Sequence, residues 1–193
     1  MDKLIYLNQS LPEELCETII EMFEKEETRY EGVTAQGLNK KVKDTMDFVI
    51  PNDSKRWERV LNTLTKELHR NLNLYIKDMK QNLPDYPLFS KNYLFENTFQ
   101  IQRYNKNIGK YVYHHDHDIR FENKDHRVIT YLWYLNTVEE GGQTEIWGDT
   151  KIKPETGKLL LFPASWTFPH SGLMPISNNK YIITGWLYES IQK

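Results

Sequence analysis

One apolar run in the second half of the chain constrains the fold more than any other feature of this sequence. Apolar side chains of this run fall on both parities, with Val128, Leu132 and Tyr134 on one and Ile129, Tyr131 and Trp133 on the other. Because successive side chains of a strand point to opposite faces, such a strand is buried on both sides. The run therefore favours a sheet with helices outside and a filled barrel inside.

The first half of the chain is expected to supply the helices. One helix is predicted to start with Ser10 as its N-cap, Pro12 in its first turn and Glu13 completing a capping box. A longer amphipathic helix is predicted after residues 53–54. Between the two, residues 28–51 are expected to be loops with one strand near 46–50. Residues 1–85 are thus predicted to form a mainly helical support region.

After Pro84 the sequence changes to short β-type runs separated by Asn-rich, Gly-Gly and Pro turn signals. The expected strands are residues 98–104, 111–116, 127–136, 144–147, 158–162 and 180–188. Many strands after two helices are typical of an α+β domain whose helices cover one sheet. The 193 residues suffice for one domain and are short for two, so we expect a single domain over 1–193 with its barrel core at 95–190.

Composition and charge exclude several classes of protein. The chain has 25 basic and 27 acidic residues, and this net charge of −2 gives no electrostatic reason for a nucleic-acid partner. Its single cysteine, Cys16, excludes an intrachain disulfide and cysteine-rich zinc modules, and it indicates a reducing compartment. No apolar run reaches the roughly 20 residues of a membrane span, and no signal peptide is apparent. We expect a cytoplasmic protein without a nucleic-acid or membrane partner.

Residues 114–118 read His-His-Asp-His-Asp at the end of an expected strand. Strand alternation places His114 and Asp116 on one face, and these two supply part of a facial triad for non-haem Fe(II). His170, after a later strand, is the expected third ligand. His69 competes for this role, but it falls on the longer predicted helix. The alternative for the whole cluster is a solvated strand end without a function.

The opposite face of the same strand carries a second set of candidate metal ligands. His115 and His117, followed by Glu122, resemble the first motif of the cupin family. Two departures count against this hypothesis. Ile129 stands where the cupin motif has a glycine, and Phe168 stands where the second motif has a ligand histidine. A cupin-type metalloprotein is therefore the weaker alternative.

Three segments in order resemble the Fe(II)/2-oxoglutarate dioxygenases, specifically the prolyl 4-hydroxylase family. They are Tyr104-x4-Gly109-x-Tyr111-x2-His114-x-Asp116, Tyr134-Leu-Asn136 followed by Glu-Glu-Gly141-Gly142-Gln-Thr144, and His170-Ser-Gly172-Leu-Met-Pro175-x4-Lys180-x5-Trp186. The resemblance covers residues 98–188. It implies a double-stranded β-helix (jelly-roll) barrel with the N-terminal helices packed on the major sheet.

The resemblance also implies how the site is built. It assigns iron binding to His114, Asp116 and His170. It assigns the far carboxylate of 2-oxoglutarate to Lys180, Tyr104 and Tyr134, and Thr184 is expected beside them because it shares the strand face of Lys180. It assigns the substrate entrance to Arg127, Trp186 and Tyr111. A place in the core is the alternative for the two cosubstrate tyrosines, and an exposed strand start is the alternative for the lysine.

The implied reaction is oxidative decarboxylation of 2-oxoglutarate to succinate and CO2, coupled to hydroxylation of an unactivated C–H bond. It requires Fe(II), 2-oxoglutarate and O2, with ascorbate as a reductant in the family. A prolyl residue in a peptide or protein is the favoured substrate, because Lys180 and Trp186 both resemble prolyl 4-hydroxylase residues. The same chemistry on another side chain, a small molecule or a nucleobase is the alternative, and the lysine anchor and the net charge argue against a nucleic acid.

Overall fold

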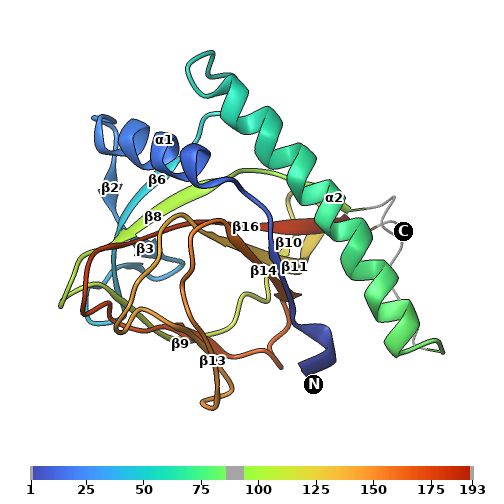
Figure 1. Ribbon diagram of the computed structural model, residues 1–193. Coiled ribbons are helices and arrows are strands. Elements are labelled where there is room, and N and C mark those ends of the chain that lie inside the picture. Colours follow the sequence, from blue (N-terminus) through green and yellow to red (C-terminus); the bar gives the residue numbers. More distant parts are fainter. Residues whose placement is uncertain (1, 86–93, 192–193) are drawn as a thin grey trace.

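The computed structural model describes residues 2–85 and 94–191. Two helices cover one face of a large sheet, and a smaller sheet lies on the opposite side of that large sheet (Figure 1). The helical elements are η1 (Asp2–Leu4), α1 (Glu13–Glu24) and α2 (Glu58–Asn82).

The major sheet contains nine antiparallel strands among the described residues, in the order β1-β14-β11-β16-β8-β6-β2, with β10 beside β11 and β7 beside β16. Their bounds are β1 (Tyr6–Gln9), β2 (Tyr30–Glu31), β6 (Met46–Val49), β7 (Leu94–Glu96), β8 (Gln100–Tyr104), β10 (Ile119–Arg120), β11 (Asp125–Tyr134), β14 (Lys158–Pro163) and β16 (Lys180–Ser190).

The minor sheet has the strand order β13-β12-β15-β9-β5. Its strands are β5 (Lys43–Asp44), β9 (Lys110–His114), β12 (Thr144–Ile146), β13 (Thr150–Ile152) and β15 (His170–Gly172). A separate hairpin joins β3 (Val33–Thr34) to β4 (Gly37–Leu38). The chain crosses repeatedly between the two sheets, and the fold is the expected double-stranded β-helix.

The central strand β11 divides its side chains between two cores. Tyr131 and Trp133 pack in the larger core beneath the helices, whereas Leu132 and Tyr134 pack in a second core between the sheets. Burial on both faces is therefore confirmed. Val128 departs from the alternation, because the strand register shifts between Arg127 and Ile129 and Val128 packs against the helix-side core.

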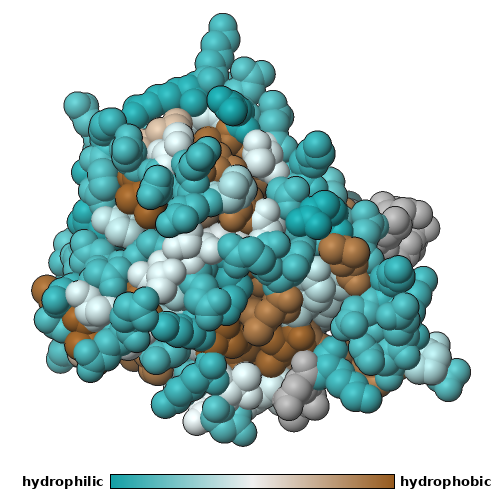
Figure 2. Space-filling model, in the orientation of Figure 1, coloured by the Kyte–Doolittle hydropathy of each residue, from teal (hydrophilic) through white to brown (hydrophobic). Residues whose placement is uncertain are grey.

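The helices bury their apolar stripes against the major sheet. Leu64, Leu68 and Tyr75 of α2 are fully enclosed, while the outer surface of this face is largely hydrophilic (Figure 2). No helix of residues 2–85 and 94–191 combines the length and apolarity that a membrane crossing needs. The capping-box prediction is wrong: α1 follows Pro12 without a side-chain cap, and the Ser10 hydroxyl donates to Glu67 on α2 instead.

Residues 30–49 contain β2 to β6, of which β6 confirms the strand expected near 46–50, whereas β2 to β5 lie where loops were expected. These strands have two to four residues each: β2 and β6 extend the major sheet, β5 extends the minor sheet, and β3 and β4 form the separate hairpin. Strands this short carry no readable apolar alternation. For the same reason, the sequence did not predict β7, β10, β13 and β15. The expected strand over 111–116 ends at His114, so Asp116 lies in the loop beyond β9.

Candidate metal centre and cosubstrate cavity

The pairing of β9 with β15 in the minor sheet brings the three expected metal ligands together. His114 ends β9, His170 begins β15, and the two residues are partners in the strand register. The loop after β9 turns Asp116 between them. Its Oδ1 lies 3.8 Å from Nε2 of His114, and its Oδ2 lies 3.5 Å from Nε2 of His170. One ligand atom from each residue falls within 4.8 Å of the other two.

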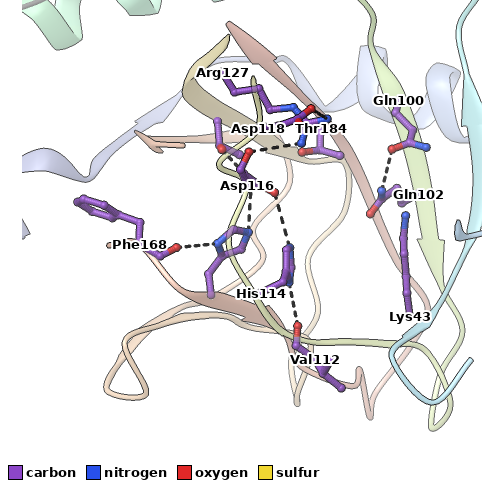
Figure 3. A network of polar contacts seen from close by, with 12 residues as sticks. Lys43, Gln100, Gln102, Val112, His114, Asp116, Asp118, Arg127, Phe168 and Thr184 are labelled. Atoms are coloured by element: carbon purple, nitrogen blue, oxygen red, sulfur yellow. Dashed lines mark hydrogen bonds and ion pairs between the residues drawn. The ribbon is translucent and has the colours of Figure 1, made fainter. Parts of the chain in front are cut away.

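Backbone carbonyls fix the orientation of both imidazoles. Nδ1 of His114 lies 2.8 Å from the carbonyl oxygen of Val112, and Nδ1 of His170 lies 3.0 Å from that of Phe168 (Figure 3). Because a carbonyl oxygen can only accept, the proton of each neutral ring sits on Nδ1. The lone pair on each Nε2 therefore faces Asp116, as a metal-binding histidine requires.

Burial and mutual charge keep His114 and Asp116 in the protonation states that bind a metal. Burial, reinforced by the nearby His170, lowers the pKa of His114 to about 4. Burial alone would raise the pKa of Asp116, but His170 and His114 outweigh it, and the pKa lies below its usual value. Neutral imidazoles and an ionised carboxylate suit Fe(II), so the residues present fit this metal.

The three ligands lie in the wall of a cavity of about 790 Å³. At its deep end, Lys180 is 1% exposed, donates 3.0 Å to the carbonyl oxygen of Gly142 and lies 4.0 Å from the ring centre of Tyr104. No carboxylate of the described residues forms an ion pair with this ammonium. Burial lowers the pKa of Lys180 to about 7. A buried cation without a counter-ion predicts an anionic ligand.

The other expected cosubstrate residues surround this end of the cavity in different ways. Tyr104 lines the cavity, and its hydroxyl donates to Oε1 of Gln102. Thr184 also lines it, although its hydroxyl donates to a backbone carbonyl. The Tyr134 hydroxyl lies behind the wall and donates 2.7 Å to Oγ1 of Thr144, which lines the cavity. This bond leaves the hydroxyl hydrogen of Thr144 available to a ligand.

The three expected substrate residues line the same cavity. The Arg127 guanidinium lies 3.6 Å from the ring centre of Trp186 and pairs with Asp118. Tyr111 stacks on His114, with 3.6 Å between ring centres and 14° between planes. Arg127 and Trp186 therefore form one wall beside the triad, and Tyr111 covers the imidazole of a ligand.

The fold does not bring the cupin-type ligand set together. His115 and His117 are exposed, with ring centres 6.3 Å apart, and Glu122 is exposed as well. Within the described ranges, the only cluster of histidine, cysteine and carboxylate groups suited to a metal is the triad above. His69 lies on α2 and contacts Glu96, away from the cavity.

Several polar residues of the site were not identified from the sequence. They are Lys43, Gln100, Gln102, Thr130 and Thr144, all lining the cavity. For the two glutamines a signal was present, because they alternate with Tyr104 on β8 and so share its inward face. Lys43 carried no such signal, since it lay in a segment expected to be loop.

The jelly roll carries two histidines in its minor sheet and a carboxylate in the loop after β9, beside a cavity with a buried cation. This arrangement defines a mononuclear metal enzyme of the facial-triad type. The chain matches the 2OG-Fe(II) oxygenase superfamily over residues 99–188. This match, the jelly-roll fold and the histidine–aspartate–histidine triad together support a 2-oxoglutarate-dependent dioxygenase of this superfamily. No curated protein matches the chain.

Solved structures with the same fold include several prolyl hydroxylases. A viral collagen prolyl hydroxylase from Paramecium Bursaria Chlorella virus-1, in complex with 2OG, is 22% identical, with 96% of each chain covered and a TM-score of 0.67. A Pseudomonas putida prolyl-4-hydroxylase is 18% identical, with 95% and 91% covered and a TM-score of 0.66. A Trichoplax adhaerens prolyl hydroxylase, in complex with a peptide fragment of hypoxia inducible factor, is 19% identical, with 97% and 84% covered and a TM-score of 0.68.

The cofactors of the superfamily are Fe(II), 2-oxoglutarate and O2, and the donor set fits them. His114, Asp116 and His170 would hold the metal, leaving its remaining positions open. When bound, Fe(II) supplies the redox chemistry that couples decarboxylation of 2-oxoglutarate to oxidation of a C–H bond. The protein would orient these ligands, and the buried Lys180 would supply the positive charge for the cosubstrate carboxylate.

Proposed function

We propose that this dioxygenase hydroxylates prolyl residues in a peptide or protein and converts 2-oxoglutarate to succinate and CO2 in the same turnover. The observation that carries the proposal is the order of residues on one face of β16. Lys180 lies at the deep end of the cavity, Thr184 follows it, and Trp186 lines the cavity near Asp116 and Arg127. One strand thus presents a cosubstrate anchor and an aromatic wall for a substrate ring.

Each residue has a defined task in this proposal. Lys180 binds the far carboxylate of 2-oxoglutarate, and Tyr104, Tyr134, Thr144 and Thr184 shape the surrounding polar pocket. The indole of Trp186 offers an apolar surface to a pyrrolidine ring.

The cavity also leaves room for a substrate. Its volume of about 790 Å³ lies within the range of ligand pockets and accommodates a small dicarboxylic acid together with one side chain. The three structural neighbours described above are prolyl hydroxylases, one of them in complex with a peptide, and their names support a peptide substrate.

The test is mass spectrometry of proline-containing peptides after incubation with the protein, Fe(II), 2-oxoglutarate and ascorbate. We expect a mass gain of one oxygen atom on proline in at least one peptide, with stoichiometric succinate. Asp116→Ala serves as the inactive control. Oxygen found only on another residue type, or succinate formation without any modified peptide across a broad panel, would contradict a prolyl substrate.

A further inference from the structure

Residues 30–49 close one side of the cavity and carry a buried ion pair. β5 extends the minor sheet and β6 extends the major sheet, so this segment spans both. Nζ of Lys43 on β5 lies 2.6 Å from Oδ2 of Asp47 on β6. Lys43 is 4% exposed and Asp47 is 0% exposed. The segment lies outside residues 99–188, over which the superfamily matches.

Close backbone packing covers one side of this ion pair. A Cβ on Gly32 would lie 3.0 Å from Cε of Lys43 and 3.2 Å from Oδ2 of Asp47, and it would overlap the Thr45 hydroxyl. Only glycine allows the backbone to approach so closely. Because a buried ion pair contributes little net stability compared with apolar residues of similar size, the fold alone does not account for it.

The charge of Asp47 sets the direction of a chain of hydrogen bonds along β8. Its Oδ2 also accepts 3.3 Å from Nε2 of Gln100. Oε1 of Gln100 then accepts 2.9 Å from Nε2 of Gln102, beside Lys43 in Figure 3, and Oε1 of Gln102 accepts from the Tyr104 hydroxyl. A carboxylate can only accept, so flipping either amide would place oxygen against oxygen.

The fixed direction of these hydrogen bonds determines which donors this side of the cavity presents to a ligand. Lys43 has three N–H groups, of which one binds Asp47 and one makes a 3.5 Å contact with the Val33 carbonyl oxygen. Gln102 uses one of its two amide hydrogens on Gln100. Among the contacts of the described residues, Lys43 and Gln102 each keep one spare donor, and both line the cavity. The ion pair leaves the wall with no net charge.

Lys43, Asp47, Gln100 and Gln102 are here called the amide wall. We propose that its two spare donors, on Lys43 and Gln102, bind main-chain carbonyl oxygens of the substrate peptide beside the reacting residue. Two donors in a wall of zero net charge fit uncharged acceptors, and peptide carbonyls are the acceptors that an extended substrate supplies. The amide wall therefore selects uncharged residues next to the reacting one. This inference rests on the proposed function, since it concerns the substrate of the same cavity.

The first test replaces the ion pair with apolar residues of similar size, in the double variant Lys43→Met/Asp47→Leu. We expect at least a tenfold higher KM for a peptide that the wild type hydroxylates, with an unchanged Kd for 2-oxoglutarate and an unchanged melting temperature. The control is Lys153→Met/Glu139→Leu, which removes an exposed pair of similar geometry and should leave the peptide KM as it is. An unchanged peptide KM, or an equal loss of 2-oxoglutarate affinity, overturns the proposal.

The second test uses Asp47→Asn, which keeps the side-chain shape and leaves the Lys43 charge without its partner. Peptides with Glu beside the reacting residue should gain at least fivefold in kcat/KM relative to matched Gln peptides, whereas the wild type should prefer Gln. An unchanged Glu-to-Gln ratio in the variant contradicts the amide wall alone. A wild type that modifies no peptide contradicts the proposed function itself, and the two failures are thereby distinguished.

Discussion

The hydroxyl of Thr130 on β11 donates a 2.8 Å hydrogen bond to Oδ2 of Asp116, the carboxylate oxygen that faces His170. Thr130 is 2% exposed, so its hydroxyl is largely shielded from bulk water. The major sheet therefore orients the one metal ligand that no strand carries.

Removing this hydroxyl should weaken metal binding without removing a ligand. For Thr130→Val we expect the affinity for Fe(II) to fall about 10- to 100-fold, the usual effect of losing a partner of a ligand. Thr130→Ser, which keeps the hydroxyl, is the matched control. Anaerobic metal titration measures the effect, and equal affinities in the valine variant and the wild type would exclude this role.

The binding of 2-oxoglutarate should weaken as the pH rises above neutrality. Burial lowers the pKa of Lys180 to about 7, so above this pH the ammonium loses its proton in the free protein. An anionic ligand favours the protonated form, and binding then requires uptake of a proton. The Kd should rise about tenfold per pH unit above 7, until the pKa of the bound state is reached. Calorimetry in buffers of different ionisation enthalpy measures both effects.

Lys180→Arg is the control for this prediction, because arginine stays charged over the accessible pH range. Its Kd should be flat with pH wherever the variant binds the cosubstrate. A wild-type Kd that does not change between pH 7 and 9 would show that Lys180 does not bind the carboxylate.

The same lysine should affect stability in the absence of ligand. Between pH 7 and its ordinary pKa of 10.5, the unfolded chain binds the proton that folded Lys180 has released. The Lys180 contribution to the free energy of unfolding therefore rises with pH through this window. Lys180→Met should remove that rise, which denaturant titrations at several pH values would detect. Identical pH profiles for variant and wild type would contradict the lowered pKa.

Trp186→Ala should damage peptide hydroxylation more than it damages peptide-independent decay of 2-oxoglutarate. Loss of the indole surface should lower kcat/KM for the peptide about tenfold or more, as expected for a buried aromatic contact. Trp166→Ala, at a residue that is 67% exposed, is the control and should leave both rates unchanged. Succinate and hydroxylated peptide are measured in parallel, and an equal loss of both would argue against a substrate role for Trp186.

The barrel and the metal centre could be predicted from the sequence because their signals are local or strongly periodic. β11 is long enough to show apolar side chains on both parities, and residues 104–116 carry a spaced motif. His170 is a candidate from its place after a later strand, and the family resemblance favours it over His69. The pairing of β9 with β15 then explains why a distant histidine belongs to the site.

The amide wall and the Thr130 contact could not be predicted for a different reason. Lys43 and Asp47 become partners only because β5 and β6 join different sheets, and strands of two to four residues leave no periodic signal. Thr130 lies in an apolar strand, and its task depends on a loop from another part of the chain. Contacts of this kind follow from tertiary packing rather than from local pattern.

The most direct test of the whole account is the rate at which four single variants convert 2-oxoglutarate to succinate in the presence of Fe(II). The variants are His114→Ala, Asp116→Ala, His115→Ala and His117→Ala. We predict that the first two fall below about 1% of the wild-type rate because a metal ligand is lost, while the last two retain most of it. Near-normal turnover in His114→Ala or Asp116→Ala, with loss in His115→Ala or His117→Ala, would contradict the assigned metal centre.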